Sequence, residues 1–259
     1  LIEHLESYYI PNGIILSLAG NINHDEITLF IDQLSKNWRK SIPKTFPQFN
    51  HDQKSPKIKT EYRNIEQSQL TLGFCHPLFR ASGKFFQEII NTILGGSMSS
   101  KLFINIRELS GFAYDIHSDL INFTDTGALV ISAGINPKNL YNALEQILFQ
   151  ISNFSYTLQD SDISNAKKLI TGRLLLDGEN TSSAAYKIGQ EYIFSSKADT
   201  MQETISKINN IQSSDLLKFI DDVFKKSNLN VVVVGPNRGS SKLSRIVESF
   251  SPSNSNFLK

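Results

Sequence analysis

The sequence has little or none of several features that would indicate a function directly. It holds one cysteine, Cys75, so neither an internal disulfide framework nor a cysteine-based zinc cluster can form. Lys and Arg number 26 against 25 Asp and Glu, and this near balance gives no sign of the basic surface that nucleic-acid binding usually needs. The longest apolar runs, such as 231–234, are far shorter than the ~20 residues that span a bilayer. We therefore expect no nucleic-acid partner and no membrane span.

Histidine pairs are also lacking. A helical zinc peptidase site needs two imidazoles one turn apart, as in H-E-x-x-H or H-x-x-E-H, so that both nitrogens reach the metal at about 2.0–2.1 Å. The chain has five histidines, none three or four residues from another: His4, His24, His51, His76 and His117. We predict that this chain alone holds no catalytic metal.

Two local patterns are reminiscent of ligand sites. Asp115, His117 and Asp119 alternate along a predicted strand and share a face, where they could hold a divalent ion, but we favour the solvated face of a half-exposed strand. The run 95–97 (GGS) has the composition of a phosphate loop, but a predicted helix precedes it and the spacing to Lys and Ser/Thr is wrong. We expect a helix–helix turn there, whose N–H groups could still contact a peptide.

Hydrophobic periodicity predicts a chain of mixed helices and strands. The predicted helices cover residues 1–9, 25–34, 82–94, 99–109, 136–154, 158–178, 181–195 and 212–226, and the predicted strands cover 14–19, 69–75, 112–122, 127–135 and 230–234. Between Trp38 and Lys59 periodicity disappears and three prolines appear, which is typical of a stiff linker. The Ser-rich end of the chain is expected to be weakly structured.

One order of secondary-structure elements occurs twice along the chain. Residues 217–235 run helix, Asn228, then an apolar strand ending in Gly, and residues 1–20 run helix, Asn12, then an apolar strand ending in Gly. Helix–turn–strand units are common, so chance is one explanation. The other is a pair of related domains, the first represented by its final helix–strand–helix unit.

Arg107 and Tyr114 are the residues most suited to contact a substrate. Arg107 lies near the end of a predicted helix and Tyr114 at the start of the next strand. A strand that folds back on its helix could bring guanidinium and phenol to one point, and both donate hydrogen bonds to a carbonyl or a developing oxyanion. A purely structural explanation competes with this, because Arg is favoured at helix C-termini and Tyr in strands.

Three groups of residues carry a family resemblance. The most specific is 94–103 (LGGSMSSKLF) with 106–108 (IRE) and 110–114 (SGFAY), which closely resembles the signature of the insulinase-like, or pitrilysin, zinc peptidases. That family includes the mitochondrial processing peptidases. Looser matches are 9–12 (YIPN) through 19–22 (AGNI), which resembles the end of the family's first domain, and 166–169 (AKKL), 174–176 (LLL) and 179–180 (EN), which resemble a long helix of its second domain.

The resemblance implies a fold and a division of the chain. The expected fold class is α+β, with a mostly antiparallel sheet and helices packed on one face. Residues 1–40 would be the C-terminal remnant of a first domain, 41–60 a linker, 61–236 the second domain, and 237–259 a tail. In the family a first domain carries H-x-x-E-H, and a later domain supplies an Arg and a Tyr to the substrate backbone. Arg107 and Tyr114 match that pair in type and spacing.

The function so implied is the substrate-binding, non-zinc half of a metalloendopeptidase, inactive by itself. Peptide would be bound by Arg107 and Tyr114, with Gly95 and Gly96 beside them, and zinc would belong to a missing domain or a partner subunit, in a homo- or heterodimer. The chain would then be a fragment of a peptidase, or part of a family subunit that lacks the zinc motif throughout. The alternative is a scaffold or assembly subunit that keeps the fold without handling peptide.

Overall fold

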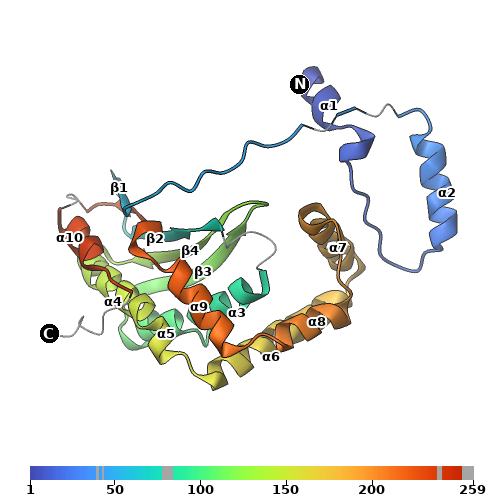
Figure 1. Cartoon of the computed structure of the whole chain (residues 1–259). Coiled ribbons are helices and arrows are strands. Elements are labelled where there is room, and N and C mark those ends of the chain that lie inside the picture. The colour runs from blue at the N-terminus through green and yellow to red at the C-terminus, as the bar shows by residue number, and fades with distance from the viewer. Residues whose placement is uncertain (39–40, 43, 78–83, 238–240, 253–259) are drawn as a thin grey trace. The chain divides into compact units, whose positions relative to one another are not determined.

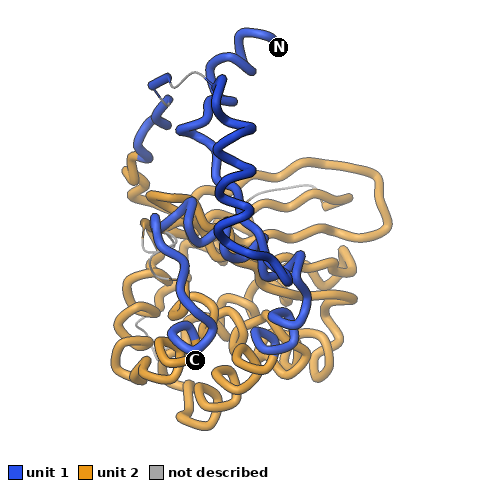
Figure 2. Tube along the Cα trace, turned by 90° about the vertical axis from the view of Figure 1, so that its right-hand side faces the viewer, with its two compact units in different colours: residues 1–49, 173–204 blue, residues 50–172, 205–259 orange. Residues whose placement is uncertain are grey.

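The computed structural model of the chain describes residues 1–38, 41–42, 44–77, 84–237 and 241–252. It divides into two compact units (Figure 2): residues 1–49 with 173–204 form unit 1, and residues 50–172 with 205–259 form unit 2. Parts of four predicted segments lie outside the described residues: positions 39–40 of the first-domain remnant, position 43 of the linker, the start of the helix at 82–83, and positions 238–240 and 253–259 of the tail.

Unit 2 is built on one five-stranded sheet of order β1-β5-β2-β4-β3 (Figure 1). The strands are β1 (Lys57–Tyr62), β2 (Ser68–Cys75), β3 (Ala113–Asn122), β4 (Gly127–Ile135) and β5 (Leu229–Gly235). β1 and β5 are parallel and the other neighbours are antiparallel, so the sheet is mostly antiparallel as predicted. Among the described residues β3 is an edge strand with β4 as its one strand neighbour, and on its other side the Ser118 N–H donates to the Gly95 carbonyl at 3.2 Å.

Helices pack on one face of this sheet, as Figure 1 shows, and the predicted α+β class is confirmed. Alternate residues of the central strand β2, Leu70, Leu72 and Phe74, are fully buried on that side. The Phe74 ring meets those of Phe224 and Phe250 at centroid distances of 5.0 and 6.0 Å. The β2 side chains between them are exposed or half-buried, so the second face of the sheet is more open.

The helices of unit 2 include those predicted from apolar stripes. They are α3 (Lys84–Leu94), the π-helix η4 (Phe103–Leu109), the short η5 (Pro137–Asn139), α4 (Leu140–Ser152), α5 (Phe154–Thr157), α9 (Ser213–Val223), η6 (Lys226–Asn228) and α10 (Ser241–Ser249). In α4 the stripe is buried at 140, 143, 144, 147, 148 and 151. Two helices cross the boundary between the units along the chain: α6 (Asp160–Gly178) and α8 (Met201–Asn209). None of the helices described is both long and apolar enough to cross a membrane.

Unit 1 contains α1 (Ile2–Tyr8), η1 (Pro11–Gly13), α2 (His24–Ser35) and α7 (Thr181–Ser195). Asn23 caps α2, its side chain accepting from the N–H groups of Asp25 and Glu26. Ile10 is the one buried hydrophobic side chain among the described residues of this unit, and α7 has none. Unit 1 therefore has regular helices but little core.

Several elements differ from the sequence prediction. The strand expected at 14–19 has no regular secondary structure: its side chains at 14–16 and 18 are 41–58% exposed, and a strand needs a neighbour that the described residues do not supply. β1 lies partly in the predicted linker, because its exposed Lys57, Lys59 and Glu61 remove the apolar signal, as is common on edges. Residues 241–249 were expected to be weakly structured but form α10, which buries Leu243, Ile246 and Val247.

Candidate functional site

The segment that carries the family resemblance forms a helix that widens into a π-helix and then reverses into β3. Residues 101–102 are α-helical, and η4 follows over Phe103–Leu109. π-turns are rare and frequently occur at functional sites. Gly111, with φ +61°, makes the reversal, and the Phe112 N–H donates to the Ile106 carbonyl at 3.0 Å. The predicted return of a strand onto its helix is therefore present.

Arg107 lies near the end of η4, with its side chain 40% exposed. Its guanidinium carbon is 4.7 Å from the centroid of the Phe103 ring. The Nε atom is 3.8 Å from Glu108 Oε1, which is an ion-pair distance but too long for a hydrogen bond. Ile106, one position earlier, is fully buried, so the helix is anchored in the core while Arg107 points away from it.

Tyr114 occupies a β-bulge at the start of β3. Ala113 pairs with Ile135 and Asp115 with Gly134, so Tyr114 is the extra residue between two ladder positions. Its side chain is 57% exposed. Bulges re-aim side chains at sheet edges, which is the geometry expected of a residue that contacts a ligand.

Arg107 and Tyr114 are thus presented by adjoining segments, one on each side of the Gly111 reversal. No hydrogen bond or ion pair joins them within the described ranges, and each side chain is substantially exposed. Both keep donor groups available. Their role in substrate binding stays a prediction.

Gly95 and Gly96 close α3 by tight packing. Their N–H groups both bind the Asn91 carbonyl, at 2.9 and 2.7 Å, so these amides are not available to a phosphate or a peptide. A Cβ on Gly95 would lie 2.8 Å from Ser118 Cβ, and one on Gly96 would lie 3.0 Å from the Asn91 carbonyl oxygen. A helix precedes these glycines, as predicted, which excludes a phosphate loop. The packing explains both glycines without a substrate. Substrate contact by the two glycines therefore stays a prediction.

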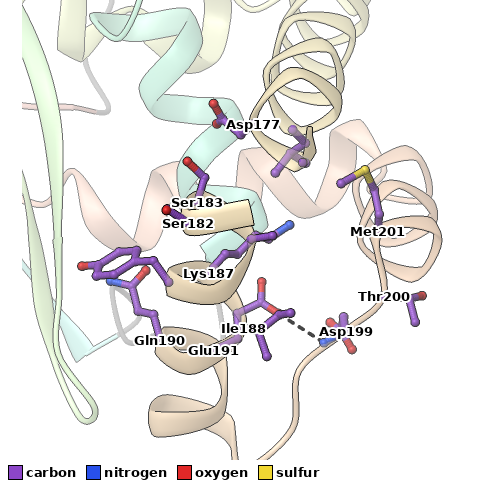
Figure 3. Close-up of a pocket in the computed structure, with 14 residues that line it drawn as sticks. Asp177, Ser182, Ser183, Lys187, Ile188, Gln190, Glu191, Asp199, Thr200 and Met201 are labelled. Atoms are coloured by element: carbon purple, nitrogen blue, oxygen red, sulfur yellow. Dashed lines mark hydrogen bonds between the residues drawn. The ribbon is translucent and has the colours of Figure 1, made fainter. Parts of the chain in front are cut away.

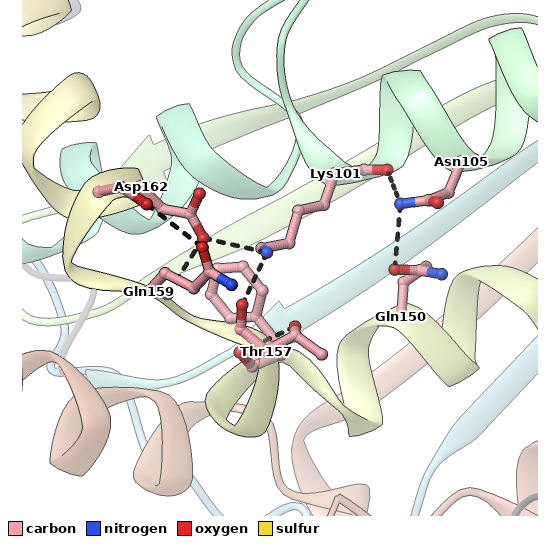
Figure 4. Close-up of polar contacts among 8 residues, drawn as sticks. Lys101, Asn105, Gln150, Thr157, Gln159 and Asp162 are labelled. Atoms are coloured by element: carbon pink, nitrogen blue, oxygen red, sulfur yellow. Dashed lines mark hydrogen bonds and ion pairs between the residues drawn. The ribbon is translucent and has the colours of Figure 1, made fainter.

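A polar network fixes the start of the helix that carries Arg107 (Figure 4). Lys101 Nζ donates to the Thr157 carbonyl at 2.9 Å and lies 3.1 Å from Asp162 Oδ2. Asn105 Nδ2 donates to the Lys101 carbonyl at 2.8 Å and approaches Gln150 Oε1 at 3.4 Å. These contacts tie the helix to α4, α5 and the first turn of α6. Sequence spacing gave no sign of the contacts between helices, because they join residues 45 or more positions apart.

The alternating acid and imidazole groups of β3 share a face, as predicted. His117 Nδ1 is 3.0 Å from Asp115 Oδ2, and Nε2 is 3.4 Å from Asp119 Oδ2, with all three side chains exposed. Among the residues that the structure describes, no group of three or more His, Cys, Asp or Glu side chains could hold a metal ion. This chain's described residues do not fit a catalytic zinc.

Two histidines from separate segments of the chain meet next to the end of β2. The rings of His51 and His76 meet edge to face at a centroid distance of 5.5 Å. Burial lowers the pKa of His76, and so do the neighbouring His51 and Lys225, while Asp222 raises it. Burial also raises the pKa of the adjacent Cys75 thiol, which keeps it protonated and unreactive, as expected of a thiol in an apolar strand.

Unit 1 contains a cavity of about 660 Å³ between the end of α6, α7 and the segment leading into α8 (Figure 3). Its lining mixes apolar groups such as Met201 with charged ones, including Asp177, Lys187 and Glu191. The Asp199 N–H donates to Glu191 Oε2 at 3.2 Å across one side of it. The cavity was not predicted, because separate turns form it and no motif spacing marks it.

Comparison with known proteins identifies the family. The family model described as the peptidase M16 inactive domain matches residues 1–170. The chain belongs to the peptidase M16 inactive-domain family. The predicted resemblance to the non-zinc C-terminal half of insulinase-type peptidases is thereby confirmed.

Curated relatives of this M16 chain are named as zinc proteases. An uncharacterized zinc protease of Rickettsia felis is 24% identical over 245 residues, which cover 91% of this chain and 57% of the relative. The uncharacterized zinc protease YmxG of Bacillus subtilis is 28% identical over 215 residues, covering 80% of this chain and 50% of the relative. The chain therefore spans about half the length of the curated relatives it matches.

Solved structures share the M16 fold. A protease from Helicobacter pylori aligns with a TM-score of 0.73 at 15% identity, over 84% of this chain and 54% of that one. A peptidase M16 inactive domain from Pseudomonas fluorescens aligns with a TM-score of 0.74 at 13% identity, over 85% of this chain and 53% of that one. At these identities the likeness concerns the fold alone.

Proposed function

We propose that this chain is the substrate-binding, non-zinc half of an M16 metalloendopeptidase, and that Arg107 and Tyr114 contact the peptide backbone. The observation that carries the proposal is the pairing of an exposed guanidinium with an exposed phenol on two sides of one reversal, inside the segment most specific for the family. Both groups donate hydrogen bonds, which suits them to a scissile or neighbouring carbonyl and to the oxyanion that develops from it.

The edge position of β3 supports an extended peptide as the substrate. Among the described residues the β3 backbone pairs with β4 on one side, and on its other side the Ser118 N–H donates to the Gly95 carbonyl at 3.2 Å. A peptide that adds as a further strand along the first residues of β3, before Ser118, would gain main-chain hydrogen bonds there, with its side chains read alternately by the neighbouring groups. Tyr114 stands at the start of that edge, so a peptide lying along β3 would pass beside the phenol.

Hydrolysis then requires a zinc-bearing half of the same family, either in the same polypeptide or in a partner subunit. The relatives that carry the name zinc protease are about twice the length matched here, which leaves room for such a half. This chain's contribution is to bind and orient the peptide, and the metal and general base come from the other half.

The repeated order of elements supports assigning residues 1–40 to that other half. In unit 2, α9, η6 and β5 follow one another, and β5 is inserted between β1 and β2. In unit 1, α1 and η1 follow in the same order and lead to the apolar residues 14–19, which begin extended at Ile14 (φ −108°, ψ 136°). By analogy with β5, we propose that residues 14–19 become a central strand when the rest of the first domain is present. We further propose 41–60 as the linker, whose last residues enter β1, and 61–236 as the second domain.

Two measurements test this function. The isolated chain supplied with zinc should not hydrolyse peptides, and appreciable chelator-sensitive turnover would contradict the division of labour. In the complete assembly, Arg107→Ala and Tyr114→Phe should each lower kcat/KM at least about tenfold, ~1.4 kcal/mol of transition-state stabilisation. If both variants keep wild-type kcat/KM, the proposed contacts are wrong.

A further inference from the structure

The guanidinium of Arg107 lies over an aromatic ring of its own helix. Arg107 Cζ is 4.7 Å from the Phe103 centroid, well inside the ~6 Å reach of a cation–π contact. The two residues are four positions apart in η4, so their side chains project from nearly the same side of the helix. Phe103 is half-buried and follows the fully buried Leu102, so part of its ring is shielded from solvent.

This contact orients the arginine without occupying its donors. A ring holds the flat guanidinium by its face, whereas hydrogen-bond partners would hold it by its N–H groups. The other close group is Glu108 Oε1, 3.8 Å from Nε, and the guanidinium makes no hydrogen bond within the described residues. The terminal nitrogens of Arg107 are therefore oriented and still free to donate.

An arginine side chain that is oriented before the peptide binds gives a higher affinity for that peptide. A long side chain that is already restricted loses less rotational freedom when it binds a ligand. The contacts of Lys101 and Asn105 hold the backbone of the same helix in place. The helix from 101 to 107 is therefore a rigid support for the Arg107 guanidinium.

We propose that Phe103 is a positioning residue for Arg107: its ring holds the guanidinium in the orientation in which it donates to the peptide. The inference rests on the proposed function, since it assigns Phe103 a role through Arg107. A merely structural role for Phe103 would affect stability, and it would not depend on the identity of residue 107.

The first test follows Arg107 directly in the isolated chain by NMR. The Nε–H resonance of Arg107 should carry a ring-current shift that Phe103→Leu removes and Phe103→Tyr retains. Phe85→Leu, the same change at a half-buried phenylalanine of α3, is the matched control and should leave that resonance in place. An Arg107 Nε–H resonance that is the same in wild type and Phe103→Leu would overturn the proposal.

The second test is a double-mutant cycle read out by the affinity for a fluorescein-labelled unfolded peptide. Phe103→Leu should weaken binding about two- to fivefold, in line with an exposed cation–π contact, and should have no further effect in an Arg107→Ala background. An equal loss in both backgrounds would show a structural role and overturn the inference. If Arg107→Ala itself leaves affinity unchanged, the proposed function fails first, and the NMR result alone then decides whether Phe103 orients Arg107.

Discussion

At the scale of single residues, the proposed chemistry depends on donors that are exposed and oriented. Arg107 is held on the Phe103 ring, and Tyr114 is placed by a bulge. The alternating imidazole and carboxylate groups of β3 contact one another: His117 lies between Asp115 and Asp119 on an exposed strand face.

His76 gives a pH dependence whose sign follows from its environment. Burial is the main cause of its lowered pKa, so the unfolded chain binds this proton more tightly than the folded chain. As pH falls through the ordinary value of 6.5 and on through the lowered one, stability is lost. The urea midpoint should therefore fall between about pH 7.5 and about pH 5.5, and His76→Gln should reduce that fall.

The matched control for this prediction is His24→Gln, which removes an imidazole from an exposed position in the first turn of α2. It should leave the wild-type pH dependence of the midpoint intact. A dependence that is equally steep in the wild type and in His76→Gln would contradict the assignment to His76.

At the scale of elements, the turn between α3 and the helix at 101–109 is fixed by steric packing. Gly95→Ala would place a Cβ 2.5 Å from Ser118 Oγ and 2.9 Å from the Ser118 backbone nitrogen, and backbone cannot move aside cheaply. We expect a loss of about 1–3 kcal/mol in the free energy of unfolding, measured by urea denaturation.

Gly172→Ala provides the matched control, because Gly172 lies inside α6 and a Cβ there meets nothing within 4 Å. It should be neutral or stabilise by about 0.5–1 kcal/mol, since alanine is the better helix former. If Gly95→Ala is as well tolerated as Gly172→Ala, close packing does not explain the glycine.

Elements with a buried stripe could be predicted from the sequence, and those whose signal depends on distant partners could not. The spacing of α4 and the alternation of β2 and β4 determine which face is buried, so periodicity located them. β1 was missed because its alternate positions are charged and exposed. The segment 14–19 has the apolar pattern of a buried strand but no sheet among the described residues, so local pattern and tertiary context disagree there.

The candidate site was predictable to a similar degree. Family resemblance singled out Arg107 and Tyr114, and the reversal that brings their segments together is present. The ring of Phe103, the Lys101–Asp162 pair and the π-helical turn were not anticipated. They depend on side-chain directions and long-range contacts, which residue spacing does not encode.

At the scale of the whole molecule, the two units differ sharply in core. The strands and helices of unit 2 bury most of the hydrophobic side chains, whereas unit 1 buries Ile10 among its described residues and leaves large apolar groups exposed on α1, α2 and α7. Local stability follows buried apolar contact. In the isolated chain, native-state hydrogen exchange should therefore be much faster for amides of α1, α2 and α7 than for those of β2, β4 and α4.

Adding a zinc-bearing half should slow exchange at residues 14–19, where we propose a strand forms. Equal protection of the two units in the isolated chain would contradict the assignment of residues 1–40 to an incomplete domain. So would fast exchange at 14–19 in the complete assembly.

The most direct test of the central claim is a titration of a fluorescein-labelled unfolded peptide with the isolated chain, followed by anisotropy. Substrate binding by this non-zinc half predicts saturable binding that Arg107→Ala weakens at least about tenfold, ~1.4 kcal/mol of binding free energy. Absence of saturable binding would instead indicate a scaffold with the same fold. Binding that is unchanged in Arg107→Ala would contradict the role assigned to that residue.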